Sequence, residues 1–294
     1  MILAAIDIGS NAARLLISEA SAYKDGTVDY TKLNLLRIPL RLGFDVFDKG
    51  FISDEKKDLL IDTLKAYKLL MNIYKVEHFR ACATSAMRDA TNSKKVLAEV
   101  EEVTGFKVNI ITGQEEANIL YETHIAEFLS ENKSYLYVDV GGGSTEVTLY
   151  SNNQLIFKES FNIGTIRVLH DKVTGEQWEH MKWYIKTHVK DYQPIEAIGT
   201  GGNINKIFSI SKRKEGKPLP VELLKDYYKE LSYTTIEERK HLYHFRDDRA
   251  DVIVPALQIY ISIMRWAGAD EIYVPKIGLA DGLIKILYKD LSKK

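Results

Sequence analysis

The chain has one cysteine, Cys82, among its 294 residues. A single thiol excludes an internal disulfide framework and any metal site built from several cysteines. The opening run Met1–Ile6 is too short for the core of a signal peptide and leads directly to Asp7. Because scarce cysteine is also typical of proteins in a reducing compartment, we expect a cytoplasmic protein.

Long apolar runs and an excess of one sign of charge are also missing. The sequence contains no stretch of about 18 apolar residues, so it predicts no transmembrane helix and no membrane partner. The net charge is −1, from 40 Lys and Arg against 41 Asp and Glu, and no global field therefore attracts nucleic acid. A polyanionic ligand would have to be held by a local basic lining.

Two similar glycine motifs follow apolar segments that are typical of buried strands. Residues 6–11 read Ile-Asp-Ile-Gly-Ser-Asn, and residues 138–146 read Val-Asp-Val-Gly-Gly-Gly-Ser-Thr-Glu. Glycine permits a tight turn and close approach of the main chain to a ligand, and consecutive N–H groups in such a turn can bind an anion. The aspartates Asp7 and Asp139 could hold a cation, directly or through water. Together these loops predict a site for a phosphate chain and its metal.

A third glycine loop, Gly199-Thr200-Gly201-Gly202-Asn203, follows another short apolar segment. None of the three loops has the spacing of a P-loop lysine motif or of a Gly-x-Gly-x-x-Gly dinucleotide turn. Clustered glycines carry an entropic cost unless something must approach the backbone. The recurrence therefore favours phosphate binding over three ordinary turns.

The order of apolar and turn-forming segments predicts an α/β chain in which one supersecondary plan occurs twice. The elements expected in the first half are strands at Ile2–Ile8 and Leu15–Ile17, a third strand after a turn at Asp25-Gly26, a helix capped by Ser53, a strand at Phe79–Ala83, a helix at Ser93–Thr104 ended by Gly105, a strand at Lys107–Ile111 and a helix at Gln114–Leu129. The helix after Ser53 should bury one stripe of residues, namely Leu59, Leu60, Leu64, Tyr67, Leu70 and Met71.

The second half repeats the plan, beginning with a strand that leads into the triple-glycine loop. We expect strands at Tyr135–Val140, Val147–Tyr150, Leu155–Phe161, Ile195–Ile198 and Glu271–Pro275, and helices at Thr165–His170, Glu176–Val189, Asp251–Trp266 and Leu279–Ser292. The basic segment Lys212–Pro220 predicts an exposed loop. The tryptophans Trp178, Trp183 and Trp266 are expected in the core. We place an N-terminal domain at 1–124 and a C-terminal domain at 125–294, whose last helix could pack back on the first domain.

Two acidic residues, Glu115 and Glu116, follow Thr112 at a predicted helix start. Acids in a first turn are favoured by capping and by the helix dipole, which would explain both residues without a catalytic role. The functional alternative is that one carboxylate points into a cleft between the domains and orients a water molecule.

The arginines Arg88 and Arg249 each allow two interpretations. Arg88 follows small residues at a strand-to-helix corner, where it could pair with Asp89 or act as a fork for phosphate oxygens. Arg249 lies among acids at a helix start, where an ion pair or cap contact is the alternative to phosphate binding. The serines lie outside any nucleophile-elbow context, and the histidines lack the spacing of a metal site.

The motifs resemble, in order, those of exopolyphosphatases and guanosine pentaphosphate phosphohydrolases (the Ppx/GppA family). The matching segments are Asp7–Asn11, Ala83–Ala90, Thr112–Ala117, Asp139–Glu146, Gly199–Gly202 and Arg249–Pro255, which span essentially the whole chain. The resemblance implies an α/β fold of two duplicated actin-like ATPase domains (the ribonuclease H-like, sugar kinase, Hsp70 and actin fold) around an interdomain cleft. It also implies a hydrolase that depends on Mg²⁺ and releases terminal phosphate from inorganic polyphosphate or pppGpp, and it suggests a homodimer.

The resemblance further implies roles for individual residues. The catalytic glutamate of the family corresponds to Glu116, and Arg88 and Arg249 look like its phosphate-binding arginines. Asp139 and Glu146 correspond to catalytic and metal-associated acids, with Asp7 as a further metal ligand. The phosphate-binding loops correspond to Gly9, Ser10, Asn11, Gly141, Gly142, Gly143, Ser144, Thr145 and Gly201.

The sequence departs from the family pattern at a few positions: Ala12, Asn203, Ala256 and Ala280-Asp281. None of these changes removes a proposed catalytic group. Some relatives carry a C-terminal helical domain of the HD type that this sequence does not include, which argues against processive handling of very long polyphosphate. Two other functions stay open, an ATP-dependent kinase of the same fold and a non-catalytic sensor that binds (p)ppGpp or polyphosphate.

Overall fold

The computed structural model describes residues 1–119, 133–152 and 154–293, and the chain divides into two compact units. Unit 1 comprises Met1–His124 and Gly278–Lys294, and unit 2 comprises Ile125–Ile277. Each unit is built on one mixed β-sheet. Among the described residues, no helix combines the length and the apolar character that crossing a bilayer would require.

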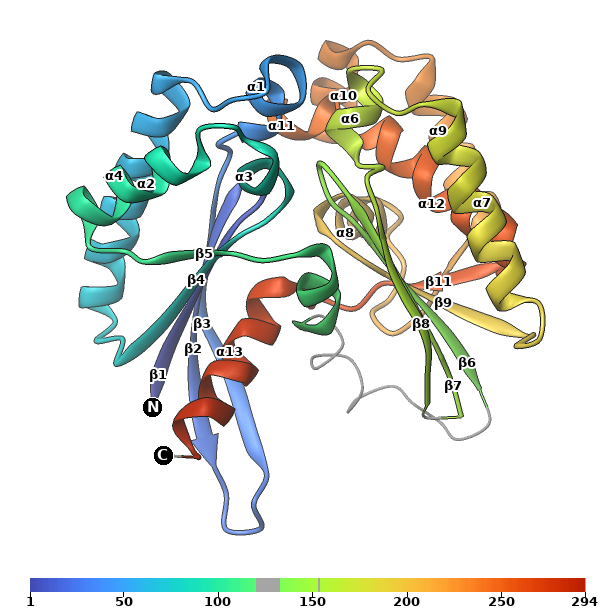
Figure 1. Cartoon of the computed structure of the whole chain (residues 1–294). Helices are drawn as coiled ribbons and strands as arrows, with labels where there is room; N and C mark the ends of the chain where they lie inside the picture. Colours follow the sequence, from blue (N-terminus) through green and yellow to red (C-terminus); the bar gives the residue numbers. More distant parts are fainter. Residues whose placement is uncertain (120–132, 153, 294) are drawn as a thin grey trace. The chain divides into compact units, whose positions relative to one another are not determined.

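Unit 1 has the strand order β3-β2-β1-β4-β5, with β1 antiparallel to β2 and parallel to β4. Helix α13 packs on one face of this sheet, and α2 and α4 lie on the other (Figure 1). The element bounds are β1 Ile2–Ile8, β2 Ala13–Ala22, β3 Val28–Ile38, α1 Leu42–Lys49, α2 Asp54–Ile73, β4 His78–Ala83, α3 Ser85–Asp89, α4 Ser93–Thr104, β5 Val108–Ile110 and α13 Leu279–Leu291.

The local signals in this unit produce most of the expected elements. Strand β1 is buried almost throughout and pairs with a returning β2, as predicted. The Ser53 side chain accepts a hydrogen bond from the N–H of Lys56 at 3.4 Å and begins α2, which confirms the predicted cap. Gly105 ends α4 in the left-handed conformation (φ 75°), also as predicted.

Two details of unit 1 differ from the sequence-based expectation. Leu59 is 39% exposed and does not belong to the buried stripe of α2, which includes Leu60, Leu64 and Tyr67. Adjacent helical residues point about 100° apart, so only one of two neighbouring leucines can face the sheet fully. Helix α1 was not predicted. Of the helix expected at Gln114–Leu129, residues 113–119 are helical, and the remainder lies outside the described residues.

Helix α13 is fixed on the unit 1 sheet by apolar packing and two ion pairs. Its buried leucines contact residues of β1 and β2. Lys32 pairs with Asp281 at 2.6 Å, and Arg80 pairs with Asp290 at 2.8 Å. A Cβ atom added at Gly282 would clash with the carbonyl oxygen of Ile119, so this glycine permits close approach of α13 to the backbone of the 113–119 helix.

Replacing Gly282 by alanine should therefore destabilise the protein by about 1–3 kcal/mol, as expected for overpacking at a tight contact. Chemical denaturation monitored by circular dichroism measures the effect. The matched control is Gly175→Ala, because a Cβ at Gly175 meets no atom within 4 Å. Equal stability of the two variants would show that α13 can shift without cost.

Unit 2 has the strand order β10-β11-β9-β6-β7-β8. Helices α7, α9 and α12 pack together against one face of the sheet (Figure 1). The element bounds are β6 Ser134–Val140, β7 Thr145–Ser151, β8 Gln154–Phe161, α6 Thr165–Leu169, α7 Gly175–Val189, β9 Ile195–Thr200, α8 Gly202–Ile210, β10 Leu219–Pro220, α9 Val221–Ser232, α10 Ile236–Tyr243, α11 Asp247–Ala250, α12 Ile253–Ala267 and β11 Glu271–Tyr273.

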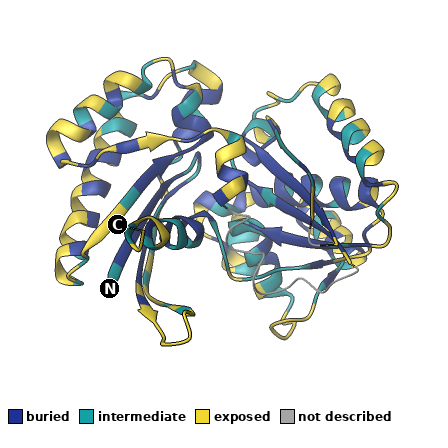
Figure 2. Ribbon diagram, turned by 60° about the horizontal axis from the view of Figure 1, so that its bottom comes forward, coloured by how far each residue is buried: buried dark blue, intermediate teal, exposed yellow. Residues whose placement is uncertain are grey.

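The two sheets share the same arrangement of five strands, to which unit 2 adds the edge strand β10, and this confirms the predicted duplication. In each, three antiparallel strands (β1–β3 or β6–β8) are extended by parallel strands beside the first, β4 and β5 or β9 and β11. Asp7 and Asp139 occupy equivalent positions near the ends of β1 and β6. In both units the central strands are buried and the outward faces of the helices are exposed (Figure 2).

Unit 2 also corrects two expectations. Trp183 is 59% exposed, whereas Trp266 is buried as predicted, because Trp183 lies on the outer side of α7 away from the buried Met181 and Ile185. The segment Lys212–Pro220 is an exposed loop only in part, since Leu219–Pro220 forms β10 beside β11. Helices α8, α9 and α10 were not predicted.

Candidate active site

Two acidic side chains lie opposite each other on neighbouring strands of unit 2. Asp139 of β6 and Glu146 of β7 are paired in the antiparallel register, which places their side chains on the same face of the sheet. Glu146 is only 3% exposed, and its Oε1 accepts hydrogen bonds from the hydroxyls of Ser144 (2.7 Å) and Ser160 (2.9 Å). Two carboxylates side by side on one face of a sheet repel each other when both are ionised, so this pair favours a cation.

The third glycine loop holds Asp139 from the other side. Thr200, which pairs with Asp139 across β9 and β6, donates its hydroxyl to Asp139 Oδ1 at 2.8 Å. Gly201 has a φ of 105°, and a Cβ here would lie 3.0 Å from the same oxygen, so glycine is required on two grounds. The buried Tyr260 hydroxyl donates to the Thr200 carbonyl. Burial, with Asp139 nearby, raises the pKa of Tyr260 well above its usual value and keeps it a donor.

The first glycine loop, after β1, is closed by the N–H of Gly9 donating to the Ala12 carbonyl at 3.0 Å. The hydroxyl of Ser10 lies 2.8 Å from that of Ser85 and accepts the N–H of Ala86 at 3.2 Å. Ser10 therefore joins this loop to the start of α3, the helix that carries Arg88. Asp7 is buried, and its Oδ2 accepts a hydrogen bond from Arg14 Nη1 at 2.7 Å.

The equivalent positions of the two units carry different charges. Arg14 lies opposite Asp7 on β2, where Glu146 lies opposite Asp139 on β7. The charges of Arg14 and Asp7 cancel in an ion pair, whereas Asp139 and Glu146 are two carboxylates. A cation is therefore favoured at Asp139 and Glu146 rather than at Asp7.

The two acids at the 113–119 helix have different environments. Glu115 is exposed, and its Oε2 accepts the N–H and the hydroxyl of Thr112 at 2.7 and 2.9 Å. These hydrogen bonds lower the pKa of Glu115, and the one from the backbone N–H of Thr112 has the largest effect. Glu116 is buried, with 9% exposed. Capping therefore explains Glu115, while the neighbouring Glu116 needs another explanation.

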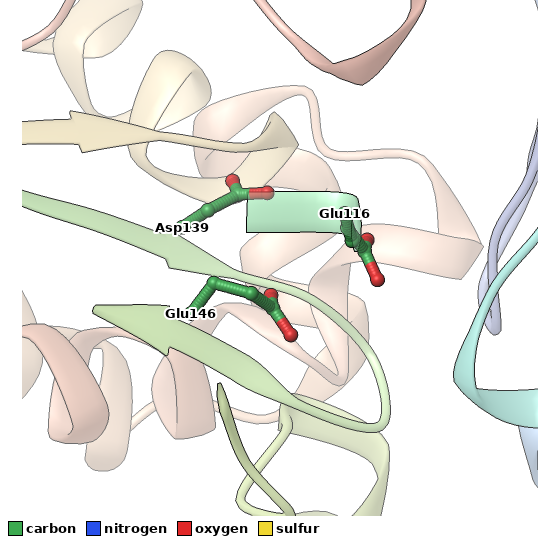
Figure 3. Close-up of side chains that lie close together, drawn as sticks. All are labelled: Glu116, Asp139 and Glu146. Carbon is green, nitrogen blue, oxygen red and sulfur yellow. The ribbon is translucent and has the colours of Figure 1, made fainter. Parts of the chain in front are cut away.

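Figure 3 shows the carboxylates of Asp139 and Glu146 beside each other, near the end of β6 and the start of β7. Each offers one oxygen atom, these two oxygens lie within 4.8 Å of each other, and the pair could hold a metal ion. A donor set made only of carboxylate oxygens suits hard divalent cations such as Mg²⁺. The residues present therefore fit the metal that the family resemblance implies.

Both candidate arginines contact backbone carbonyls beside the candidate loops. Arg88 is half-buried and donates from Nη1 to the carbonyl of Ile111 at 2.8 Å, directly before the Thr112 cap. Arg249 donates from Nη1 to the carbonyl of Gly202 and, at 3.3 Å, to Asn203 Oδ1. The guanidinium of Arg249 therefore lies at the third glycine loop.

The sequence assigned no role to four residues that support the site: Arg14, Ser160 and Thr200, which contact predicted acids, and Tyr260, which contacts Thr200. Three of these residues can be located only from their positions on the strands. Arg14, Ser160 and Thr200 are each paired by strand register with a predicted acid, so a correct register would have located them. Tyr260 lies inside α12, and no local pattern marks it.

Three curated proteins show sequence similarity along much of this chain. It is 30% identical over 228 residues to a bifunctional 3-dehydroquinate synthase/phosphatase of Fusobacterium nucleatum (72% of this chain, 34% of the relative). It is 25% identical over 319 residues to a guanosine-5'-triphosphate,3'-diphosphate pyrophosphatase of Pseudoalteromonas translucida (99% and 60%). It is 26% identical over 310 residues to Exopolyphosphatase 2 of Mycobacterium tuberculosis (96% and 97%). The chain thus spans about a third of the first relative and 60% of the second.

The fold also matches solved structures. The crystal structure of the Aquifex aeolicus member of the Ppx/GppA family superposes with a TM-score of 0.75 at 26% identity, covering 99% of each chain. The sequence model of the Ppx/GppA phosphatase family matches residues 24–292. The chain therefore belongs to the Ppx/GppA phosphatase family and has its actin-like ATPase fold.

Proposed function

We propose that this protein hydrolyses the terminal phosphoanhydride bond of inorganic polyphosphate or of pppGpp by attack of water. The pair of Asp139 and Glu146 carries the proposal, because two facing carboxylates beside a glycine loop suit a metal-bound phosphate chain. Two of the similar proteins are named for these substrates, an exopolyphosphatase and a pppGpp pyrophosphatase. Family membership supports the same reaction class.

Asp139 and Glu146 are the proposed ligands of Mg²⁺, whereas Asp7 is paired with Arg14. When bound, the ion would neutralise phosphate oxygens and favour in-line displacement. The hydrogen bonds from Thr200 to Asp139 and from Ser144 and Ser160 to Glu146 each engage a carboxylate oxygen, and so they fix the direction of both side chains.

Glu116 is the proposed base that orients the attacking water and accepts its proton. It is buried, and the adjacent Glu115 already makes the cap contacts, so helix initiation does not require Glu116. A positioned carboxylate can serve as a general base when the water lies within hydrogen-bond reach.

The glycine loops are the proposed holders of the terminal phosphates. The first loop contributes Gly9, Ser10 and Asn11, and the second contributes Gly141–Thr145, with Gly201 from the third loop. Backbone N–H groups in such loops stabilise charge on phosphoryl oxygens without reorganising during the reaction. Arg88 and Arg249 would neutralise the remaining phosphate oxygens.

A phosphate-release assay with long-chain polyphosphate, tripolyphosphate, pppGpp and ATP, with and without Mg²⁺, tests this function. We expect orthophosphate from polyphosphate or pppGpp only when Mg²⁺ is present. ADP formation that requires an added acceptor would identify a kinase instead. Tight binding of guanosine nucleotides with no phosphate release at any Mg²⁺ concentration would identify a sensor.

Replacing Arg88 by alanine should raise the KM for polyphosphate or pppGpp about 10- to 100-fold, because a hydrogen bond to a charged group is worth about 1.5–3 kcal/mol. Steady-state kinetics measure the change. The control is Arg80→Ala, which removes the same charge from an exposed pair with Asp290 in the same unit. If Arg88→Ala keeps the wild-type KM and kcat, Arg88 only supports the carbonyl of Ile111.

A further inference from the structure

The triple-glycine loop of unit 2 is held from behind by the segment Ile163–Arg167, which we call the loop clamp. The N–H of Thr165 donates to the carbonyl of Gly141 at 3.0 Å, and the N–H of Ile166 donates to that of Gly142 at 2.8 Å. Arg167 donates from Nε to the carbonyl of Gly143 at 2.7 Å. The clamp therefore engages all three glycine carbonyls.

This arrangement fixes where the amide groups of the loop point. In a trans peptide the C=O of one residue and the N–H of the next point in opposite directions. Since three successive carbonyls point to the clamp, the N–H groups of Gly142, Gly143 and Ser144 point away from it together. A row of parallel N–H groups is an anion-binding concavity.

The clamp lies directly on the loop, with no side chain between them. A Cβ atom at Gly164 would lie 2.5 Å from backbone atoms of Gly142 and Gly143, so any other residue there must displace the loop. The hydroxyl of Thr145 donates to the Ile163 carbonyl at 2.5 Å and fastens the far side of the loop to the same segment.

Unit 1 repeats the arrangement at its own glycine loop. The N–H of Gly43 donates to the carbonyl of Ser10 at 2.8 Å, and the N–H of Arg41 donates to that of Asn11 at 2.9 Å. Arg41 has a left-handed backbone (φ 54°), which is uncommon for a residue other than glycine, and its guanidinium lies over the Phe44 ring. In both units a segment that follows the third strand holds the loop that follows the first strand.

We propose that Gly164 and Arg167 are positioning residues for phosphate binding: they orient the amides of the triple-glycine loop toward the terminal phosphate. This inference rests on the proposed function, because it assigns these amides to the same substrate. Gly164 acts by permitting contact between clamp and loop. Arg167 acts by holding the Gly143 carbonyl, and neither residue is required to touch the substrate.

The test compares clamp variants with matched controls by calorimetric titration with tripolyphosphate and Mg²⁺, and by steady-state kinetics. Arg167→Ala should weaken tripolyphosphate binding about tenfold, the scale of one charge-assisted hydrogen bond, and should raise KM more than it lowers kcat. Arg167→Lys restores a donor and should recover most of the affinity. Gly164→Ala should weaken binding at least as much.

The controls are Gly175→Ala, where a Cβ meets no atom within 4 Å, and Arg265→Ala, which removes one exposed charge at the C-terminal end of α12. Both should bind tripolyphosphate as the wild type does, and unfolding temperatures identify any variant that fails to fold. Wild-type affinity and KM in both Arg167→Ala and Gly164→Ala would overturn the inference while leaving the proposed hydrolysis intact. Clamp-dependent binding without phosphate release would uphold the inference and contradict the hydrolysis.

Discussion

Replacing Glu116 by glutamine is expected to lower kcat about 10²- to 10⁴-fold while the protein still folds and binds its substrate. The amide keeps the shape of the side chain but cannot accept the proton of the attacking water, and a positioned base contributes on this scale. The N-terminal cap of the helix is unaffected because Glu115 makes those contacts. Turnover is measured by phosphate release and affinity by calorimetric titration with tripolyphosphate.

The neighbouring Glu115→Gln is the matched control, since it removes the same charge one residue away. Glu115 is exposed and contacts Thr112 only through the cap, so its replacement should leave kcat close to the wild-type value. Near-wild-type turnover in Glu116→Gln would remove Glu116 from the mechanism. A larger loss of kcat in Glu115→Gln than in Glu116→Gln would show that Glu115, not Glu116, is the base.

Replacing Asp139 by asparagine should lower activity at least about 100-fold and weaken metal binding at least about tenfold. The amide can still accept the hydroxyl of Thr200 through its oxygen, so local geometry is kept while one of two facing negative charges is lost. Electron paramagnetic resonance with Mn²⁺ alone measures the affinity, and the activity dependence on Mg²⁺ gives an independent value.

Asp7→Asn is the informative comparison, because Asp7 occupies the equivalent position of unit 1. Its carboxylate is paired with Arg14, whereas Asp139 faces Glu146. We therefore expect a smaller loss of Mn²⁺ affinity in Asp7→Asn than in Asp139→Asn. Equal losses in the two variants would contradict the assignment of the metal to the acids of unit 2.

Local signals in the sequence were sufficient for the strands and glycine loops that frame the site. The apolar run of β1, the Ser53 cap and the Gly105 stop depend on nearby residues alone, and all three were predicted correctly. The doubled loop motif also predicted the duplicated sheet topology. The roles proposed for Glu116, Asp139 and Glu146 come from the family resemblance, since no local pattern distinguishes these acids from others.

Features that depend on register or on tertiary packing could not be read from the sequence. The pairing of Asp7 with Arg14 requires the exact alignment of β1 and β2. Glu115 and Glu116 fit the first turn of a helix equally well, and only their side-chain partners separate the cap from the buried acid. Trp183 was placed in the core from its residue type, but the helix face on which it lies decides its exposure.

Two departures from the family pattern have structural partners in this chain. Asn203, where threonine is frequent in the family, accepts a hydrogen bond from Arg249 at 3.3 Å. Asp281 pairs with Lys32 and accepts the N–H of Gly278 at 2.8 Å at the start of α13. Asn203 contacts an arginine at the third glycine loop, and Asp281 contributes to the start of α13; neither residue replaces Glu116, Asp139 or Glu146. The homodimer that the resemblance suggests stays a prediction.

Hydrolysis in water enriched with ¹⁸O tests the central claim most directly, because it identifies the nucleophile and the bond that breaks. With tripolyphosphate or pppGpp and Mg²⁺, mass spectrometry should find one solvent oxygen in the released orthophosphate and none in the shortened substrate. Solvent oxygen in the shortened substrate, or transfer of phosphate to an acceptor without any labelled orthophosphate, would contradict attack of water on the terminal phosphoryl group.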